Sequence, residues 1–259
     1  MIKKILHIIV FSGLLTGIVT AMGFSLNSNM DKTSQGLEVS VASRSGNYFI
    51  DEGDIKNILV QRFDTLEGMR IDPILLQKIN EAVNNIPFVS RAEVYRTING
   101  ELRVNALLRD PLARVVNSNN QSFYIDTEGY MFPLSDKYTA RVMMITGSIR
   151  TDYSAGANIA GIKVGVEEFS PPGLFELASY IHGDNFWRAF TDHIIMLPNG
   201  KFELVPKNGA HIIEFGEAND IGEKFSRLMA FYRNGLSQVG WDHYNRLNLE
   251  FNNQIICSK

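Results

Sequence analysis

The chain has 259 residues, of which 45% are hydrophobic, and a formal net charge of −3. This length and composition allow one or two folded domains, each with its own core. Nucleic-acid binding requires a basic stripe, so the net negative charge argues against a nucleic-acid partner. The single cysteine, Cys257, excludes an internal disulfide framework, and its place in an apolar run close to the C-terminus favours a structural role.

An apolar run near the N-terminus, residues 5–24, is about long enough to cross a bilayer as a helix. Lys3 and Lys4 precede it, and no basic residue follows until Lys32. Positive charge is retained on the cytoplasmic side of a membrane, which predicts a cytoplasmic N-terminus and places the rest of the chain outside. Hydroxyls within the run are tolerable because they can bond to backbone carbonyls one turn back.

A cleaved signal peptide is the alternative reading of this run. Residues 19–21, Val-Thr-Ala, form a small-residue cleavage site, after which the mature chain would start at Met22. The unbroken apolar stretch is long for a signal peptide, which favours a retained anchor. Residues 1–4 are then cytoplasmic, residues 5–25 form a single transmembrane helix, and residues 26–36 form a tether.

The first folded unit begins with a strand over residues 37–41, where apolar and polar residues alternate. Two helices follow. Residues 51–63 carry apolar residues at helical spacing, with Asp51 as N-cap and Asp54 three positions later. Asp72 caps a second helix that starts at Pro73 and ends before Pro87.

Two alternating segments, residues 91–97 and 101–108, flank Asn99-Gly100. Asn-Gly is the preferred pair for a two-residue hairpin turn, in which both central residues need positive φ. The order is therefore strand, helix, helix, strand, strand. A three-stranded sheet with both helices on one face is the economical packing.

The remainder predicts a β-rich domain, an antiparallel sheet with about two covering helices. The helix over residues 220–234 opens with Asp220 and Glu223, which suits reciprocal capping, and Gly235 is placed to end it. Phe186, Trp187 and Phe190 form an aromatic cluster that is more often core than a ligand cage. The other predicted segments are strands at 122–125, 129–132, 141–145, 193–197, 201–205, 211–215, 247–251 and 254–259, a helix at 171–182 and an exposed loop at 151–165.

The sequence contains no pattern typical of a catalytic or metal site. The histidines are dispersed and have no cysteine partners, and no phosphate-binding or dinucleotide fingerprint is present. Asp126 and Glu128 could pair as acid and base, but their context, YIDTEGY, favours a turn. We therefore expect no catalytic residue, no metal, no cofactor and no small-molecule substrate.

Several stretches, in this order, resemble the FtsQ/DivIB family of bacterial cell-division proteins, and most closely its Bacteroidota versions. They are NYFID, IPFVSRAEVYRTINGELRV and LLRDPLARV, with Arg109, Pro111, Ala113 and Arg114 in the last, followed by SFYIDTEGYMFPLS. The resemblance implies an α+β protein with one N-terminal transmembrane helix. It further implies a POTRA domain over residues 37–110 and an FtsQ-type β domain over residues 111–259.

The resemblance also implies a function. The family is a non-enzymatic divisome scaffold that joins FtsB and FtsL outside the inner membrane. It helps to recruit and regulate the septal peptidoglycan synthases FtsW and FtsI. The expected location is the inner membrane at the division septum, with most of the chain in the periplasm. The alternative from another class is a membrane-anchored or secreted periplasmic hydrolase of the cell envelope.

The family resemblance places the partner site at the C-terminal strands, whose open edge pairs with a segment of FtsB. An edge strand exposes unpaired N–H and C=O groups on which another chain can add as a strand. The matching residues are Phe251, Asn253, Gln254 and Ile256, with Phe251 as the large apolar anchor. The alternative is that Ile255 and Cys257 simply complete the core.

Overall fold

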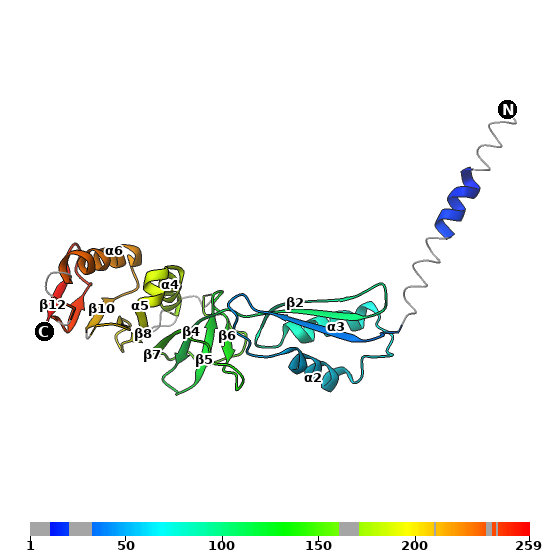
Figure 1. Ribbon diagram of the computed structural model, residues 1–259, viewed down its shortest axis with the longest axis horizontal. Helices are drawn as coiled ribbons and strands as arrows, with labels where there is room; N and C mark the ends of the chain where they lie inside the picture. Colours follow the sequence, from blue (N-terminus) through cyan, green and yellow to red (C-terminus); the bar gives the residue numbers. More distant parts are fainter. Residues whose placement is uncertain (1–10, 21–32, 161–170, 210, 237–239, 242) are drawn as a thin grey trace, which may run out of the picture. The chain divides into compact units, whose positions relative to one another are not determined.

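The computed structural model describes residues 11–20, 33–160, 171–209, 211–236, 240–241 and 243–259 (Figure 1). The chain forms two compact units. The first comprises the chain up to Ala42 together with Ile50–Leu107, and the second comprises Ser43–Phe49 together with Leu108–Lys259. Each unit has its own sheet.

Part of the predicted membrane anchor falls outside the described residues. Residues 11–20 are helical and exposed. Within them, the hydroxyls of Thr16 and Thr20 donate to the carbonyls of Ser12 and Thr16, at 2.7 Å and 2.9 Å. These bonds confirm the predicted bonding of hydroxyls one turn back. Among the helices that the structure describes, none has the length and hydropathy required to cross a bilayer.

The first unit has the predicted element order. Its elements are β1 (Leu37–Ala42), α2 (Glu52–Phe63), α3 (Pro73–Asn84), β2 (Val89–Arg96) and β3 (Leu102–Leu108). The sheet order is β1-β3-β2, and β1 runs parallel to the central strand β3. Alternate residues of β3 are buried. They form a core with Val39, Ile55, Leu59, Ile79 and Val83.

Both helices of this unit begin as their sequences predict. Asp51 and Asp54 form a reciprocal capping box at the start of α2, with both N···O distances 2.9 Å. Asp72 accepts from the backbone N–H of Leu75 at 2.8 Å, and Pro73 opens α3. These local bonds satisfy N–H groups that a helix leaves unpaired at its first turn.

The hairpin between β2 and β3 is confirmed, but the predicted two-residue turn is wrong. The Thr97 N–H donates to Glu101 O at 2.9 Å, and the Gly100 N–H donates to Thr97 O at 3.0 Å. Gly100 has φ of +89°, whereas Asn99 is not one of the residues with positive φ. The turn therefore has three residues, with only the third left-handed.

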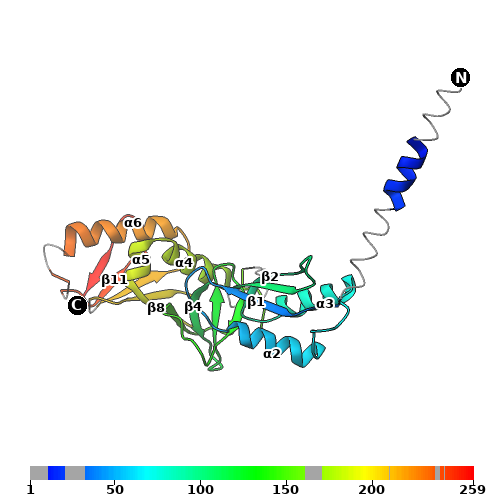
Figure 2. The ribbon, with the colours of Figure 1, turned by 45° about the vertical axis from the view of Figure 1, so that its right-hand side comes forward.

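The second unit contains one nine-stranded sheet in the order β12-β11-β10-β9-β8-β7-β4-β5-β6. Helices α4, α5 and α6 lie on one face of it (Figure 2). Its strands are β4 (Pro111–Val116), β5 (Ser122–Asp126), β6 (Met131–Pro133), β7 (Met143–Gly147), β8 (Thr191–Met196), β9 (Phe202–Pro206), β10 (Ile212–Gly216), β11 (Arg246–Asn248) and β12 (Ile256–Ser258). Its helices are α4 (Pro171–Gly183), α5 (Asn185–Phe190) and α6 (Ile221–Phe231), followed by the π-helical turn η1 (Tyr232–Leu236).

The prediction of a purely antiparallel sheet is wrong, because the sheet is mixed. β4 and β7, β7 and β8, and β10 and β11 are parallel neighbours. Parallel neighbours need a crossover connection, which is usually helical. The α4–α5 segment joins β7 to β8, and the α6–η1 segment joins β10 to β11. The helices expected as covers are therefore also the crossovers.

The start and end of α6 differ from the prediction. Asp220 has a left-handed backbone, with φ of +47°, and makes no side-chain cap bond to a described residue. Lys224 instead fastens the preceding loop by donating to Asn219 Oδ1 at 2.7 Å. Gly235 does not end the helix, since it lies within η1. The prediction that the aromatic cluster is core holds for two of its three members: Trp187 and Phe190 are buried beside Tyr232, whereas Phe186 is 42% exposed.

The segment Ser43–Phe49 lies within the range predicted for the first domain, yet it packs in the second unit. Phe49 is fully buried there. Its ring lies 5.3 Å from those of Tyr124 and Phe132 and 5.6 Å from that of Tyr138, measured between centroids. The Ser135 hydroxyl donates to the Phe49 carbonyl at 2.5 Å. Phe49 is thus a core residue of the second unit.

Candidate functional site

The C-terminal strand β12 ends the nine-stranded sheet (Figure 1). It is antiparallel to β11 through three pairs, Arg246 with Ser258, Leu247 with Cys257, and Asn248 with Ile256. β11 in turn runs parallel to β10. A strand with only one neighbour leaves the backbone groups of its other side unpaired within the sheet.

The hydrogen bonds between β10 and β11 determine which residues of β12 point outward. Asn245 O accepts from the Ile212 N–H, and the Leu249 N–H donates to Glu214 O. Within β11, Leu247 therefore directs its backbone groups toward β10, and Arg246 and Asn248 direct theirs toward β12, because the direction alternates along a strand. The Asn245 N–H, just before β11, also donates to Ser258 O on β12, at 2.8 Å. Ile256 and Ser258 face Asn248 and Arg246, respectively. The N–H and C=O of Cys257 consequently point to the free edge.

Charged side chains on the face opposite the helices hold β11 in place. Arg246 forms ion pairs with both Glu203 on β9 and Glu214 on β10. Asn248 donates to Glu214 Oε2 at 2.6 Å. The hydrogen bond from Arg246 to Glu214 raises the pKa of the guanidinium above its ordinary value. This cluster fastens the strand on which β12 depends.

The chain between the two strands is also fastened. Lys201 pairs with Glu250 at 2.6 Å, and this hydrogen bond raises the pKa of the Lys201 ammonium group. Arg227 on α6 donates to the Leu249 carbonyl at 3.0 Å. Asn253 has φ of +60°, which makes the turn after Phe251. The hairpin that carries β12 is thereby tied to both faces of the sheet.

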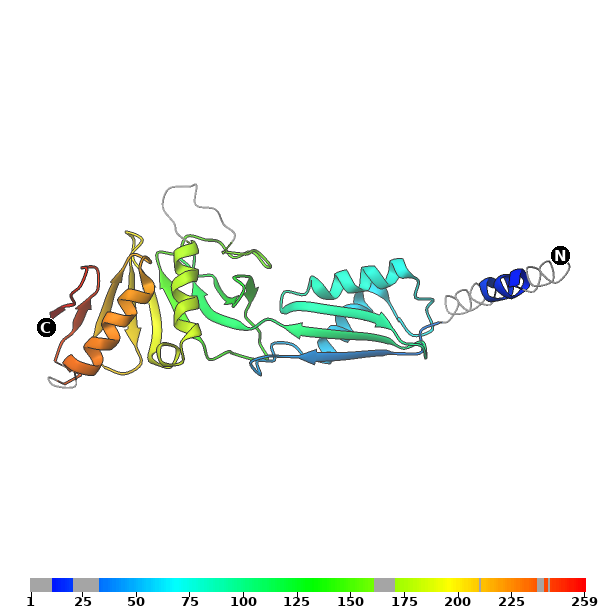
Figure 3. The same ribbon diagram turned by 90° about the horizontal axis from the view of Figure 1, so that it is seen from above.

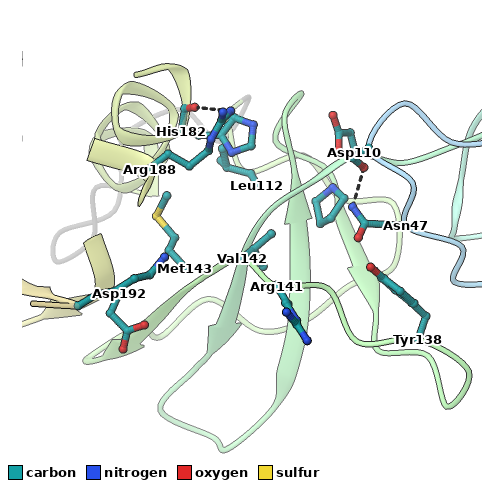
Figure 4. Close-up of a pocket in the computed structure, with 13 residues that line it drawn as sticks. Asn47, Asp110, Leu112, Tyr138, Arg141, Val142, Met143, His182, Arg188 and Asp192 are labelled. Atoms are coloured by element: carbon teal, nitrogen blue, oxygen red, sulfur yellow. Dashed lines mark hydrogen bonds between the residues drawn. The ribbon is translucent and has the colours of Figure 1, made fainter. Parts of the chain in front are cut away.

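The second unit also contains a groove of about 510 Å³, away from β12, which we considered as a possible active site (Figure 4). His182 and Arg188 line one side of it, and Arg188 donates to the His182 carbonyl at 3.3 Å. Burial lowers the pKa of His182, and the charge of Arg188 lowers it further. Ser45 also lines the groove and accepts from Asn47 at 2.6 Å. Among the described residues we find no nucleophile bonded to a base there, so we assign it no reaction.

The described residues also contain no group of three or more histidine, cysteine, aspartate or glutamate side chains suited to hold a metal ion. Asp126, which the sequence offered as a possible catalytic acid, has a structural role. It pairs with Arg109 at 2.6 Å, with both side chains largely buried, and accepts from the N–H groups of Glu128 and Tyr130. Asp126 thus organises its turn, as its sequence context predicts.

Comparison with known protein families matches the chain over almost all of its folded length. Residues 110–258 match the family described as FtsQ/DivIB, C-terminal related. The chain belongs to the FtsQ/DivIB family. Residues 32–106 match a POTRA-like domain. None of the curated proteins compared with the chain matches it.

Family membership confirms the resemblance drawn from the sequence and identifies a cell-division protein. The predicted partner residues of this FtsQ/DivIB chain lie in and beside the C-terminal hairpin. Phe251 is 47% exposed and Ile256 is 45% exposed, and Asn253 and Gln254 are exposed as well. Ile256 lies on the edge strand itself, whereas the other three precede it. The predicted strand over 254–259 is shorter, at Ile256–Ser258.

Sequence reasoning missed the Arg246 cluster and the outward backbone of Cys257. Arg246 is 43 residues from Glu203 and 32 from Glu214, so no local spacing joins them. The sequence did carry one signal for this cluster: charged residues alternate with apolar ones on these short strands, so their side chains share one face of the sheet. Cys257 was considered for its side chain, which is half-buried against the core. Its backbone direction depends on the pairing of β11 with both neighbours.

Proposed function

We propose that this FtsQ/DivIB protein is a non-enzymatic divisome scaffold whose edge strand β12 binds an FtsB-like partner by strand addition. The observation that carries the proposal is the outward N–H and C=O of Cys257 on the last strand of the sheet. Backbone pairing would provide affinity, and side chains at alternate positions would provide selectivity. FtsL is the expected companion of FtsB in this complex.

Phe251 and Ile256 supply the apolar part of the proposed contact, since both are nearly half exposed. Asn253 and Gln254 supply polar groups beside the edge strand. A large apolar side chain flanked by polar groups is the usual composition of the centre and rim of an interface. Through this contact the protein would help to recruit and regulate FtsW- and FtsI-type septal synthases, from a single-pass position in the inner membrane with its folded units in the periplasm.

The direct test is Cys257→Pro, with Cys257→Ala as its matched control. Proline removes the outward N–H, and proline is tolerated on an edge strand whose N–H faces solvent. The alanine variant makes a similar change to side-chain packing but keeps the N–H. We expect both variants to fold and to remain with the membrane fraction, and only the proline variant to lose capture of the FtsB-like partner. Capture by the proline variant at the wild-type level would place the binding site elsewhere.

Proline at Ile256 is a poorer test. The backbone of Ile256 faces Asn248, so proline there would weaken the pairing of β12 with β11 as well as any partner contact. Loss of binding would then have two explanations.

The division role itself is tested by depletion of the protein in cells. A divisome scaffold predicts filamentous cells with unseparated septa. Normal division with an altered profile of cell-wall fragments would favour the alternative of an envelope hydrolase, which none of the structural observations supports.

A further inference from the structure

Four hairpin turns of this protein have the same backbone construction. In each, the first residue's N–H donates to the fifth residue's carbonyl, and the fourth residue's N–H donates to the first residue's carbonyl. The fourth residue has positive φ in every case. The turns span residues 97–101, 117–121, 126–130 and 197–201.

One of the four turns differs at its second position. That position is Ser118, Thr127 and Pro198 in the three turns of the second unit, all residues that suit turns. In the first unit it is Ile98, which is 87% exposed. A β-branched apolar side chain in water contributes nothing to the turn, so its presence points to a contact outside the folded unit.

Ile98 does not stand alone. Outside the helix at 11–20, the two most exposed large apolar side chains that the structure describes are Ile98 and Ile74, which is 66% exposed at the start of α3. Met69, in the loop before α3, is 38% exposed. Isolated exposed apolar residues are normal, whereas a group at one end of a domain indicates an interaction surface.

The loop before α3, the start of α3 and the β2–β3 turn, which carry these three residues, lie at the end of the first unit where the described segment 33–160 begins at Thr33 (Figure 3). The Ser34 N–H donates to Met69 O at 2.8 Å, and the Gln35 N–H donates to Gly100 O at 3.1 Å. Thr33 forms a β-bridge with Arg70. Backbone contacts therefore hold residues 33–35 between the loop before α3 and the tip of the β2–β3 hairpin.

Chain length limits how far this end can lie from a bilayer that holds residues 5–25. Only residues 26–32 separate that segment from Thr33. A chain of this length spans at most about 30 Å when fully extended and about 15 Å as a flexible coil. We propose that the apolar end formed by Ile98, Met69 and Ile74 contacts the surface of the bilayer that anchors this same chain, with Ile98 inserted deepest.

The charges at this end favour apolar insertion over attraction to anionic lipid. Acidic and basic side chains are nearly balanced among the residues described there, since four basic ones meet five acidic ones. They are Arg62, Arg70, Arg96, Arg103, Glu38, Asp64, Glu67, Asp72 and Glu101. The contact is therefore expected on uncharged phosphatidylcholine vesicles as well as on anionic ones. It rests on the predicted anchor and does not depend on the proposed partner site at β12.

The test uses the full chain with Cys257→Ser, reconstituted in phosphatidylcholine vesicles, with a nitroxide spin label at Ile98→Cys. The control label is at Asn85→Cys, an exposed position at the other end of α3. The 12 residues of α3 separate its ends by about 18 Å. The measurement compares how often each label collides with oxygen and with a water-soluble nickel chelate. Because oxygen concentrates in lipid, a high ratio of oxygen to nickel collisions shows that the label is in lipid rather than in water.

We expect the ratio of oxygen to nickel collisions to be several-fold higher at position 98 than at position 85, and a label at Ile74→Cys to follow position 98. Equal ratios at positions 98 and 85 in protein that floats with the vesicles would overturn the bilayer contact and leave the anchor intact. A label at position 98 shielded from both reagents would indicate a second protein copy and would also overturn it. Protein that fails to float would contradict the anchor and the contact together.

Discussion

Phe49 and Phe251, two aromatic residues of the second unit, differ sharply in exposure. Phe49 is fully buried among three aromatic rings, whereas Phe251 is 47% exposed beside the edge strand. Burial of an aromatic side chain contributes to folding, and a half-exposed one on an interface contributes to binding. If Phe251 belongs to the proposed contact, substitutions at these two residues should separate stability from partner capture.

Phe49→Ala should lower the free energy of unfolding of the second unit by about 3–5 kcal/mol, because it removes a large side chain and leaves a cavity. The neighbouring Tyr48 is 52% exposed, so Tyr48→Ala should change it by no more than about 0.5 kcal/mol. Denaturant titration of both variants measures the difference. Equal effects would mean that Ser43–Phe49 is not part of this core.

Phe251→Ala should leave the unfolding free energy nearly unchanged but weaken binding of the FtsB-like partner by about 2 kcal/mol, roughly 30-fold in the dissociation constant. Calorimetric titration of the partner segment into the two proteins measures this. Unaltered affinity in the variant would remove Phe251 from the proposed contact.

At the scale of elements, the sequence predicted those features that depend on neighbouring residues. The caps of α2 and α3 are formed by side chains within three positions of the helix start, so Asp51 and Asp72 could be recognised directly. β4 was not predicted as a separate strand because four of its six residues are buried and the alternation is weak. The capping predicted for α6 is absent because Asp220 has a left-handed backbone, whereas an N-cap residue needs an extended one.

The β2–β3 turn allows the predicted and observed geometries to be compared by mutation. Gly100→Ala should cost about 1–2 kcal/mol, since a left-handed residue with a Cβ is strained and the Cβ would lie 3.2 Å from Thr33 O. Asn99→Ala should cost less than about 0.5 kcal/mol, because only Gly100 needs positive φ. Thermal unfolding of both variants tests this. A two-residue turn would make the two substitutions comparably costly.

For the whole molecule, strand direction was the feature that local patterns could not supply. Alternation predicts that a segment is a strand but not which neighbour it pairs with or in which direction. β10 and β11 become parallel because α6 and η1 carry the chain back across the sheet. The same crossover places Arg246 against Glu203 and Glu214 and leaves β12 at the edge.

The proposed edge contact is tested most directly by amide hydrogen exchange at β12 with and without the FtsB-like partner segment. The Cys257 N–H points away from β11 and should exchange rapidly in the free protein. Strand addition should slow its exchange by at least about tenfold, because it would gain a backbone hydrogen bond. The Ile256 N–H faces β11 in both states and serves as the control, with a much smaller change expected. Exchange at Cys257 that stays rapid in the saturated complex would contradict strand addition at this edge.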